Sequence, residues 1–211
     1  PFSLILQLPN ANSTLLIIFG LLSILMGGWG GLNQTQLRKI LGYSSIAHLG
    51  WMILILQFMP SLAFLAFMTY IILTFSMFLT FMYTQATTIN MISTAWPKNP
   101  MISAITPLTL LSLGGLPPLT GFLPKWMILS ELTKQGLMLA ATAAALSALL
   151  SLYFYLRLSY AMTLTTSPNN LPATLPWRTS FYCPTMPLAT SSTIALCLLP
   201  LSPTILALFS F

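Results

Sequence analysis

The stretch from Pro107 to Glu131 restricts the fold more than any other part of this sequence. It is apolar enough to lie in a bilayer, yet it contains two adjacent glycines, four prolines and one isolated lysine. Pro117 and Pro118 have no amide hydrogen, so the carbonyls of Leu113 and Gly114 lose their usual helical partners. In hydrocarbon an unsatisfied carbonyl is costly unless it is buried in protein or lines a wet cavity. The sequence therefore predicts a broken helix near 107–131.

The residues expected to form this break are Gly114, Gly115, Pro117, Pro118 and Pro124. The apolar segment around them runs from 102 to 132, which is longer than the roughly 20 residues that one straight crossing needs. That length favours two half-helices. Discontinuous membrane helices often surround ion or substrate sites, so the break is also a candidate functional site.

Composition decides the class of protein. Of the 211 residues, 56% are hydrophobic and 4% are charged, whereas about 25% of a soluble domain is charged. The apolar runs are also much longer than the alternating segments of about 10 residues that build a membrane β-barrel. We therefore predict an all-α, polytopic membrane helical bundle. Its seven basic residues are too scattered for a nucleic-acid interface, and its two cysteines lack histidine or acid at metal-ligand spacing.

We expect a single transmembrane domain in seven segments, the first of them only the tail of a span. The segments are 1–8, 13–29, 36–57, 62–83, 102–132 (discontinuous), 137–160 and 188–211. The chain opens on Pro1 in an apolar run, so we expect an N-terminal part to be missing. The glycine-rich run 27–31 should close the second segment, with Trp29 as an interfacial anchor. Tyr153–Tyr155 and Tyr160 are expected to form an aromatic girdle.

These segments place most positive charges on one side of the membrane. With alternating crossings, five basic residues fall on the side of the 33–36 loop: Arg38, Lys39, Lys98, Arg157 and Arg178. Lys134 alone falls on the other side, and Lys125 lies within the membrane. This asymmetry follows the positive-inside rule, which places the 33–36 loop on the cytoplasmic or matrix side.

Lys125 is the first candidate for function, because a lysine beside a broken membrane helix is costly to insert. It could load and release a proton, with its charged form held by the negative end of the first half-helix near Leu113–Gly115. A lysine that only snorkels to the interface is the structural alternative. Glu131 is the one acid in the sequence. It either pairs with Lys134 at the rim, which is the simpler interpretation, or ends a proton path.

His48 is the second candidate. It lies four residues after Ser44 and three after Ser45, so the three side chains share one helix face. That polar face must meet other helices or water. His48 could pass protons along it, or it could simply pack, bonded to a carbonyl of the next helix. The residues alone favour packing.

Three motifs resemble NADH dehydrogenase subunit 2 of mitochondria, in its vertebrate form. The first runs from Trp29 to Met52 and includes His48, and the second runs from Leu111 to Trp126 and includes Lys125. The third is Leu152–Arg157. The resemblance covers essentially the whole chain and matches the C-terminal part of the family's sequence.

This resemblance implies an antiporter-like subunit in the membrane arm of respiratory complex I, the proton-pumping NADH:ubiquinone oxidoreductase of the mitochondrial inner membrane. Protons would move along a hydrated relay driven by electron transfer in other subunits. Lys125 and His48 match relay residues of the family, which reverses the interpretation of His48. NADH, FMN, iron–sulfur clusters and ubiquinone would be bound by other subunits, and this chain alone would hold no redox site. The implied partners are the other membrane-arm subunits and the lipid bilayer, including cardiolipin.

Two other classes of protein stay open. One is a free-standing secondary cation/proton antiporter, although a sodium site would usually need an acid within the membrane. The other is a purely structural membrane subunit. Water between His48 and Lys125 would favour the relay, whereas a dry, tightly packed gap would favour the structural subunit.

Overall fold

The computed structural model describes residues 12–93, 100–164, 189–190 and 192–193, and in these ranges the chain forms a helical bundle. The helices are α2 (Ser13–Leu32), α3 (Leu37–Leu56), α4 (Pro60–Thr84), α5 (Ile89–Ser93), α6 (Pro100–Gly114), α7 (Phe122–Lys134) and α8 (Met138–Thr163). The expected segment 1–8 and nearly all of 188–211 lie outside the described residues. So do Lys98, Arg178 and both cysteines.

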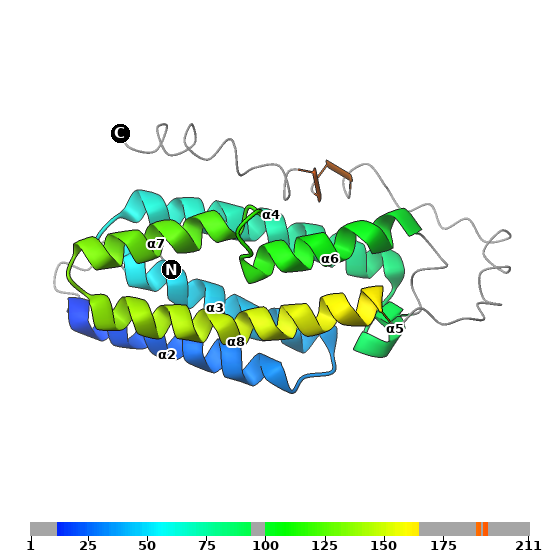
Figure 1. The fold of residues 1–211 in the computed structure, drawn as a ribbon, viewed down its shortest axis with the longest axis horizontal. Helices are drawn as coiled ribbons and strands as arrows, with labels where there is room; N and C mark the ends of the chain where they lie inside the picture. The colour runs from blue at the N-terminus through cyan, green and yellow to red at the C-terminus, as the bar shows by residue number, and fades with distance from the viewer. Residues whose placement is uncertain (1–11, 94–99, 165–188, 191, 194–211) are drawn as a thin grey trace, which may run out of the picture.

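Four of these helices are long and apolar enough to cross a membrane. They are α2, α3, α4 and α8, with 20, 20, 25 and 26 residues. Helices α6 and α7 are shorter, with 15 and 13 residues, and they follow one another along the bundle as two halves of one crossing (Figure 1). The prediction of an all-α, polytopic bundle with a broken helix near 107–131 is confirmed.

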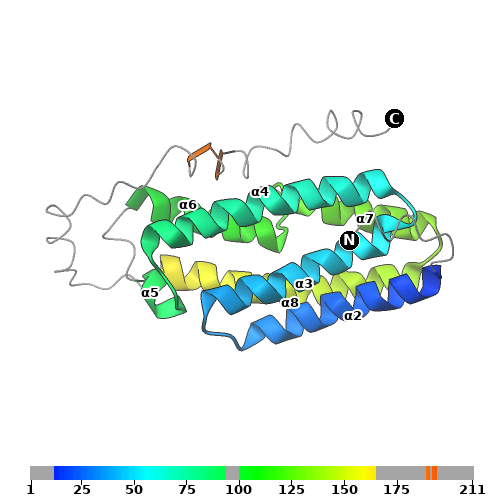
Figure 2. The same ribbon diagram turned by 180° about the vertical axis from the view of Figure 1, so that it is seen from behind.

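One end of the bundle collects the polar loops. The loop after α2 meets the loop after α4, where the amide of Leu37 donates to Thr87 O at 3.1 Å and the amide of Ile89 donates to Thr35 O at 3.2 Å. Figure 2 shows α5 and the end of α8 at this same end. Arg157, near the end of α8, donates from Nη1 to Leu32 O at 2.9 Å. The guanidinium group of Arg157 therefore joins the ends of α8 and α2.

The glycines of α2 lie against its two neighbouring helices, Gly27 against α3 and Gly28 against α8. A Cβ atom at Gly27 would lie 2.6 Å from the amide nitrogen of Ala47, and one at Gly50 would lie 2.7 Å from Cγ1 of Ile24. The run 27–31 forms the last turns of α2, which ends at Leu32, three residues beyond the expected end of the segment. Small residues at a helix–helix contact let two backbones approach closely in a membrane.

The expected aromatic girdle on α8 is split between two faces. Tyr153 and Tyr160 are exposed, as is Trp29 at the end of α2, whereas Phe154 and Tyr155 are buried. The prediction is therefore wrong for Phe154 and Tyr155. Consecutive residues of a helix point about 100° apart, so three adjacent aromatic residues cannot share one outward face.

Two apolar clusters fill the interior. The cluster at the loop end joins α3, α4, α6 and α8 through residues such as Ile40, Met77, Leu110 and Leu158. The cluster at the other end joins α2, α3, α4, α7 and α8 through residues such as Ile24, Trp51, Ile128 and Ala144. The end of α6 and the start of α7 lie between these clusters, where Gly114 and Lys125 are buried, whereas Pro117 and Pro118 in the turn are exposed.

Candidate functional site

The break begins with a regular helix C-terminus. The amide of Leu116 donates to Leu111 O at 3.3 Å and the amide of Gly115 donates to Ser112 O at 3.0 Å, which is the Schellman arrangement. Gly115 has a φ of +83°, a left-handed conformation that glycine adopts without steric cost. The chain then turns through 115–121 before α7 begins at Phe122.

The prolines occupy positions that a broken helix tolerates. Pro117 and Pro118 lie in the turn between the two half-helices, and Pro124 lies in the first turn of α7. A missing amide hydrogen in a first turn costs no helical hydrogen bond. Pro107 lies inside α6 without ending it. The predicted set Gly114 to Pro124 therefore lies at the break.

Lys125 occupies the end of α6. Its Nζ donates to Gly114 O at 2.8 Å and contacts Leu113 O at 3.5 Å. These are two of the carbonyls that the prolines leave without amide partners, and they form the negative end of the α6 dipole. The predicted contact between Lys125 and this helix end is confirmed. The side chain is 8% exposed, so Lys125 does not snorkel to the surface of the bundle.

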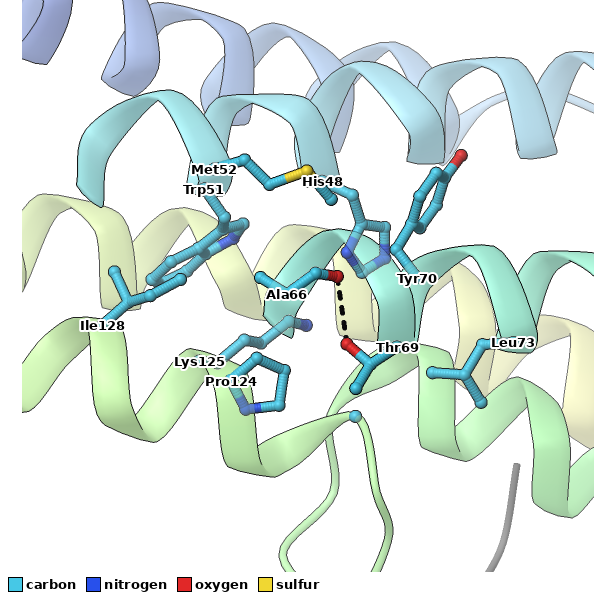
Figure 3. Close-up of a pocket in the computed structure, with 11 residues that line it drawn as sticks. His48, Trp51, Met52, Ala66, Thr69, Tyr70, Leu73, Pro124, Lys125 and Ile128 are labelled. Carbon is cyan, nitrogen blue, oxygen red and sulfur yellow. Dashed lines mark hydrogen bonds between the residues drawn. The ribbon is translucent and has the colours of Figure 1, made fainter. Parts of the chain in front are cut away.

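A small cavity connects Lys125 with His48. Its volume is about 20 Å³, and its lining includes Lys125 from α7, His48 from α3 and Tyr70 from α4 (Figure 3). A cavity of roughly 10–15 Å³ is enough for one water molecule when polar groups surround it. Trp51 and Ile128 form part of its apolar wall. The space between the two candidate residues is thus large enough for a bridging water.

Aromatic contact fixes the orientation of His48. Its ring centroid lies 4.9 Å from that of Tyr70, with an interplanar angle of 32°. The hydroxyls of Ser44 and Ser45 donate to carbonyls of their own helix, at 2.7 and 2.6 Å. A proton path from His48 along these serines stays a prediction, while the cavity towards Lys125 is a feature of the structure.

Glu131 lies away from this cavity, near the end of α7. Its Oε2 accepts a hydrogen bond from Lys134 Nζ at 3.2 Å, and its Oε1 accepts one from Gln135 Nε2 at 3.4 Å. The predicted pair with Lys134 is present. The structure therefore brings Lys125 and His48 together without Glu131, whose role as the end of a proton path stays a prediction.

Three aromatic or polar residues of the cavity lining were not expected as site residues. Tyr70 and Thr69 lie on α4, in the expected segment 62–83, and Trp51 lies on the helix of His48. The Thr69 hydroxyl already donates to Ala66 O at 3.0 Å. The position of Tyr70 near the middle of its segment is the one signal that could have identified it.

The chemistry of the site is that of groups that exchange protons. The amine of Lys125 and the imidazole of His48 line the cavity, whereas the hydroxyl of Tyr70 points away from it (Figure 3). In the part of the chain that the structure describes, no three His, Cys, Asp or Glu residues are grouped to hold a metal ion. A broken helix with a buried lysine at mid-bundle is the arrangement expected of an ion-translocating membrane protein.

The comparison with protein families agrees with this arrangement. The profile of the family described as "NADH:quinone oxidoreductase/Mrp antiporter, TM" matches residues 2–151. The chain belongs to this family. The profile described as "NADH dehydrogenase subunit 2 C-terminus" matches residues 152–206. Both elements of the site, the α6–α7 break and the His48 helix, lie within the part that the first profile covers.

Members of this family with named functions are close in sequence. NADH-ubiquinone oxidoreductase chain 2 of Tetraodon nigroviridis is 65% identical over 210 residues, which cover 100% of this chain and 60% of that protein. The corresponding protein of Gadus morhua is 63% identical with the same coverage. The chain thus spans about 60% of the length of the curated relatives it matches. The resemblance to NADH dehydrogenase subunit 2 is confirmed.

Solved membrane complexes share the fold. A chain of respiratory complex I from Thermus thermophilus, with bound aureothin, superposes with a TM-score of 0.74 at 25% identity, covering 93% of this chain and 45% of that one. A chain of the Mrp complex from Dietzia superposes with a TM-score of 0.71 at 14% identity, covering 93% and 46%. At that lower identity the likeness concerns the fold alone.

Proposed function

We propose that this chain is part of a membrane-arm subunit of the proton-pumping NADH:ubiquinone oxidoreductase, a multi-pass protein of the mitochondrial inner membrane. In this proposal Lys125 and His48 exchange protons across the cavity between α3 and α7. The observation that supports it is the position of Lys125, whose amine is bound by free carbonyls at the end of α6 and shares a water-sized cavity with His48.

The geometry suggests how such a relay is switched. Hydrogen bonds to a charged group contribute about 1.5–3 kcal/mol each, and moving one charge across a membrane costs about 2.3 kcal/mol per 100 mV. These quantities are similar. A small movement of the end of α6 relative to Lys125 would therefore change the stability of the ammonium form by the amount that transfer against the membrane potential requires.

The redox chemistry of the complex would take place elsewhere. NADH, FMN, iron–sulfur clusters and ubiquinone would be bound by other subunits, whose electron transfer drives the relay. The partners of this chain would be the other membrane-arm subunits. Lipid, cardiolipin included, would cover the outward apolar side chains of α2 and α8, among them Phe19, Leu22, Leu146 and Leu149.

The proposal is tested by replacing Lys125 with Met in the full-length subunit. Protons translocated per NADH oxidised are then measured in vesicles that contain the intact complex. We expect a lower ratio, because the variant keeps the length of the side chain and loses the proton-carrying amine. Lys134→Met is the matched control, since Lys134 is exposed at the rim and should leave the ratio unchanged. Normal assembly with an unchanged ratio in Lys125→Met would contradict the proposal.

The same site bears on the two other classes of protein. A sodium antiporter usually needs a carboxylate at its ion site, and the one acid of this chain is paired with Lys134 away from the cavity. A structural subunit needs no space between Lys125 and His48, yet the cavity there has room for water. Both observations favour the proton relay.

A further inference from the structure

Thr69 is a polar residue of the cavity between Lys125 and His48, and the relay proposed above gives it no role. It lies on α4 and lines the same volume of about 20 Å³ as the amine and the imidazole. Figure 3 shows its hydroxyl on the side of the residue that faces Lys125 and His48. Thr69 therefore offers a third polar group to a water molecule in this volume.

The Thr69 hydroxyl has a fixed orientation. It donates its only hydrogen to Ala66 O, three residues earlier on the same helix, at 3.0 Å. A threonine hydroxyl carries one hydrogen and two lone pairs. Towards the cavity, the oxygen of Thr69 can therefore only accept a hydrogen bond.

The amine of Lys125 has the opposite property. Its Nζ donates to Gly114 O at 2.8 Å and contacts Leu113 O at 3.5 Å. A charged amine carries three hydrogens and no lone pair, so one hydrogen remains for the cavity after two point to these carbonyls. A donor from α7 and an acceptor from α4 thus border the same water-sized space.

We propose that Thr69 orients a water molecule between Lys125 and His48, and that it is a positioning residue for proton transfer between them. The inference rests on the function proposed above. The water accepts a hydrogen bond from Lys125 Nζ, donates one hydrogen to Thr69 Oγ1 and donates the other to an unprotonated ring nitrogen of His48. These are three hydrogen bonds, the number that a buried water typically forms.

This orientation prepares the transfer from Lys125 to His48. An N–H bond of the amine breaks as an O–H bond to the water forms, and the water's O–H bond towards His48 breaks as a ring N–H bond forms. The amine becomes neutral and the imidazole becomes charged, so the total charge of the site is unchanged. Without the acceptor on Thr69, the water's hydrogens have no fixed directions, and the orientation that permits transfer is less populated.

Thr69→Val in the full-length subunit tests the inference, because valine keeps the branched shape and removes the acceptor. We expect normal assembly of the complex and a rate of NADH-driven proton translocation lowered about fivefold, the factor that one hydrogen bond contributes. Thr69→Ser keeps the hydroxyl and should keep the normal rate. Thr74→Val is the matched control: Thr74 is also half-buried on α4, and its hydroxyl also donates within the helix, to Tyr70 O at 2.8 Å, but it does not line the cavity.

A second readout separates an oriented water from a structural role of Thr69. The ratio of translocation rates in H₂O and D₂O should rise in Thr69→Val and stay unchanged in Thr74→Val, because a misoriented water slows the proton transfer itself. A purely structural threonine predicts equal effects of the two valine variants, since each loses one hydrogen bond within α4. Equal losses in these variants, a normal rate in Thr69→Val or a slow rate in Thr69→Ser would overturn the inference.

A high-resolution cryo-EM map of the wild-type complex tests the water without any substitution. It should show density within hydrogen-bond distance of both Lys125 Nζ and Thr69 Oγ1. A cavity without density, or density out of reach of Thr69, would overturn the inference even if Thr69→Val fails to assemble. If Lys125→Met lowers translocation and Thr69→Val does not, the inference fails while the proposed function stands, and if neither variant lowers it, both fail.

Discussion

Gly115 and Lys125 depend on each other at the residue scale. The left-handed conformation of Gly115 turns the chain out of α6, and a Cβ atom there would lie 3.0 Å from both Cδ and Nζ of Lys125. A left-handed conformation costs a non-glycine residue about 1–2 kcal/mol. We expect Gly115→Ala to destabilise the protein by more than this, because its Cβ atom would also meet Lys125. Chemical unfolding of the full-length subunit in detergent measures the change.

Gly136→Ala is the control for that experiment. Gly136 also has a left-handed φ, of +76°, but no atom lies within 4 Å of a Cβ built there. Gly136→Ala should therefore lose only the stability that a left-handed conformation costs a non-glycine residue. Equal losses for the two variants would show that Lys125 does not occupy the space next to Gly115.

The residues of the site differ in how far the sequence could predict them. The carbonyls that bind Lys125 follow from the prolines, because Pro117 and Pro118 lie four residues after Leu113 and Gly114. This prediction was possible because a helical carbonyl and its amide partner are always four residues apart. Thr69 could not be placed in this way, because its position in the cavity lining depends on how α4 is rotated about its axis against α3 and α7.

The close packing of α2 against α3 depends on how these two helices lie against each other. Gly27→Ala would place a Cβ atom 2.6 Å from the Ala47 amide nitrogen, and overpacking of this kind costs about 1–3 kcal/mol. Gly42→Ala, on the open face of α3 with no atom within 4 Å, should be neutral or stabilise the helix by up to about 1 kcal/mol. Unfolding in detergent compares the two variants. Similar stabilities would contradict the close contact of these helices.

Helix existence was easier to predict than the role of the glycines. Long apolar runs must form helices in a bilayer, because each backbone group needs an internal partner. That argument identified the ranges of α3, α4 and α8 within a few residues. The run 27–31 was expected only to close the segment. Its contacts with α3 and α8 depend on the tertiary structure and have no local signal.

The arrangement of the whole molecule fixes which loops share a membrane side. Asn33 follows α2 at the end where Arg38, Lys39 and Arg157 lie, and Gln135 follows α7 at the opposite end. We expect a membrane-impermeant maleimide to label Asn33→Cys from the matrix side and Gln135→Cys from the other side, by the positive-inside rule. The background should have both native cysteines changed to serine. Labelling of both sites from one side would contradict the topology.

The central claim is that Lys125 and His48 act as one relay across their shared cavity. A double-mutant cycle in the full-length subunit tests it most directly, with NADH-driven proton translocation as the measured quantity. Lys125→Met removes the amine, and His48→Phe keeps a ring against Tyr70 while removing both nitrogens. Residues that act as one unit show strongly non-additive effects. We predict that the double variant translocates protons no more slowly than the slower single variant, whereas independent effects that multiply, or a normal rate in either single variant, would contradict the relay.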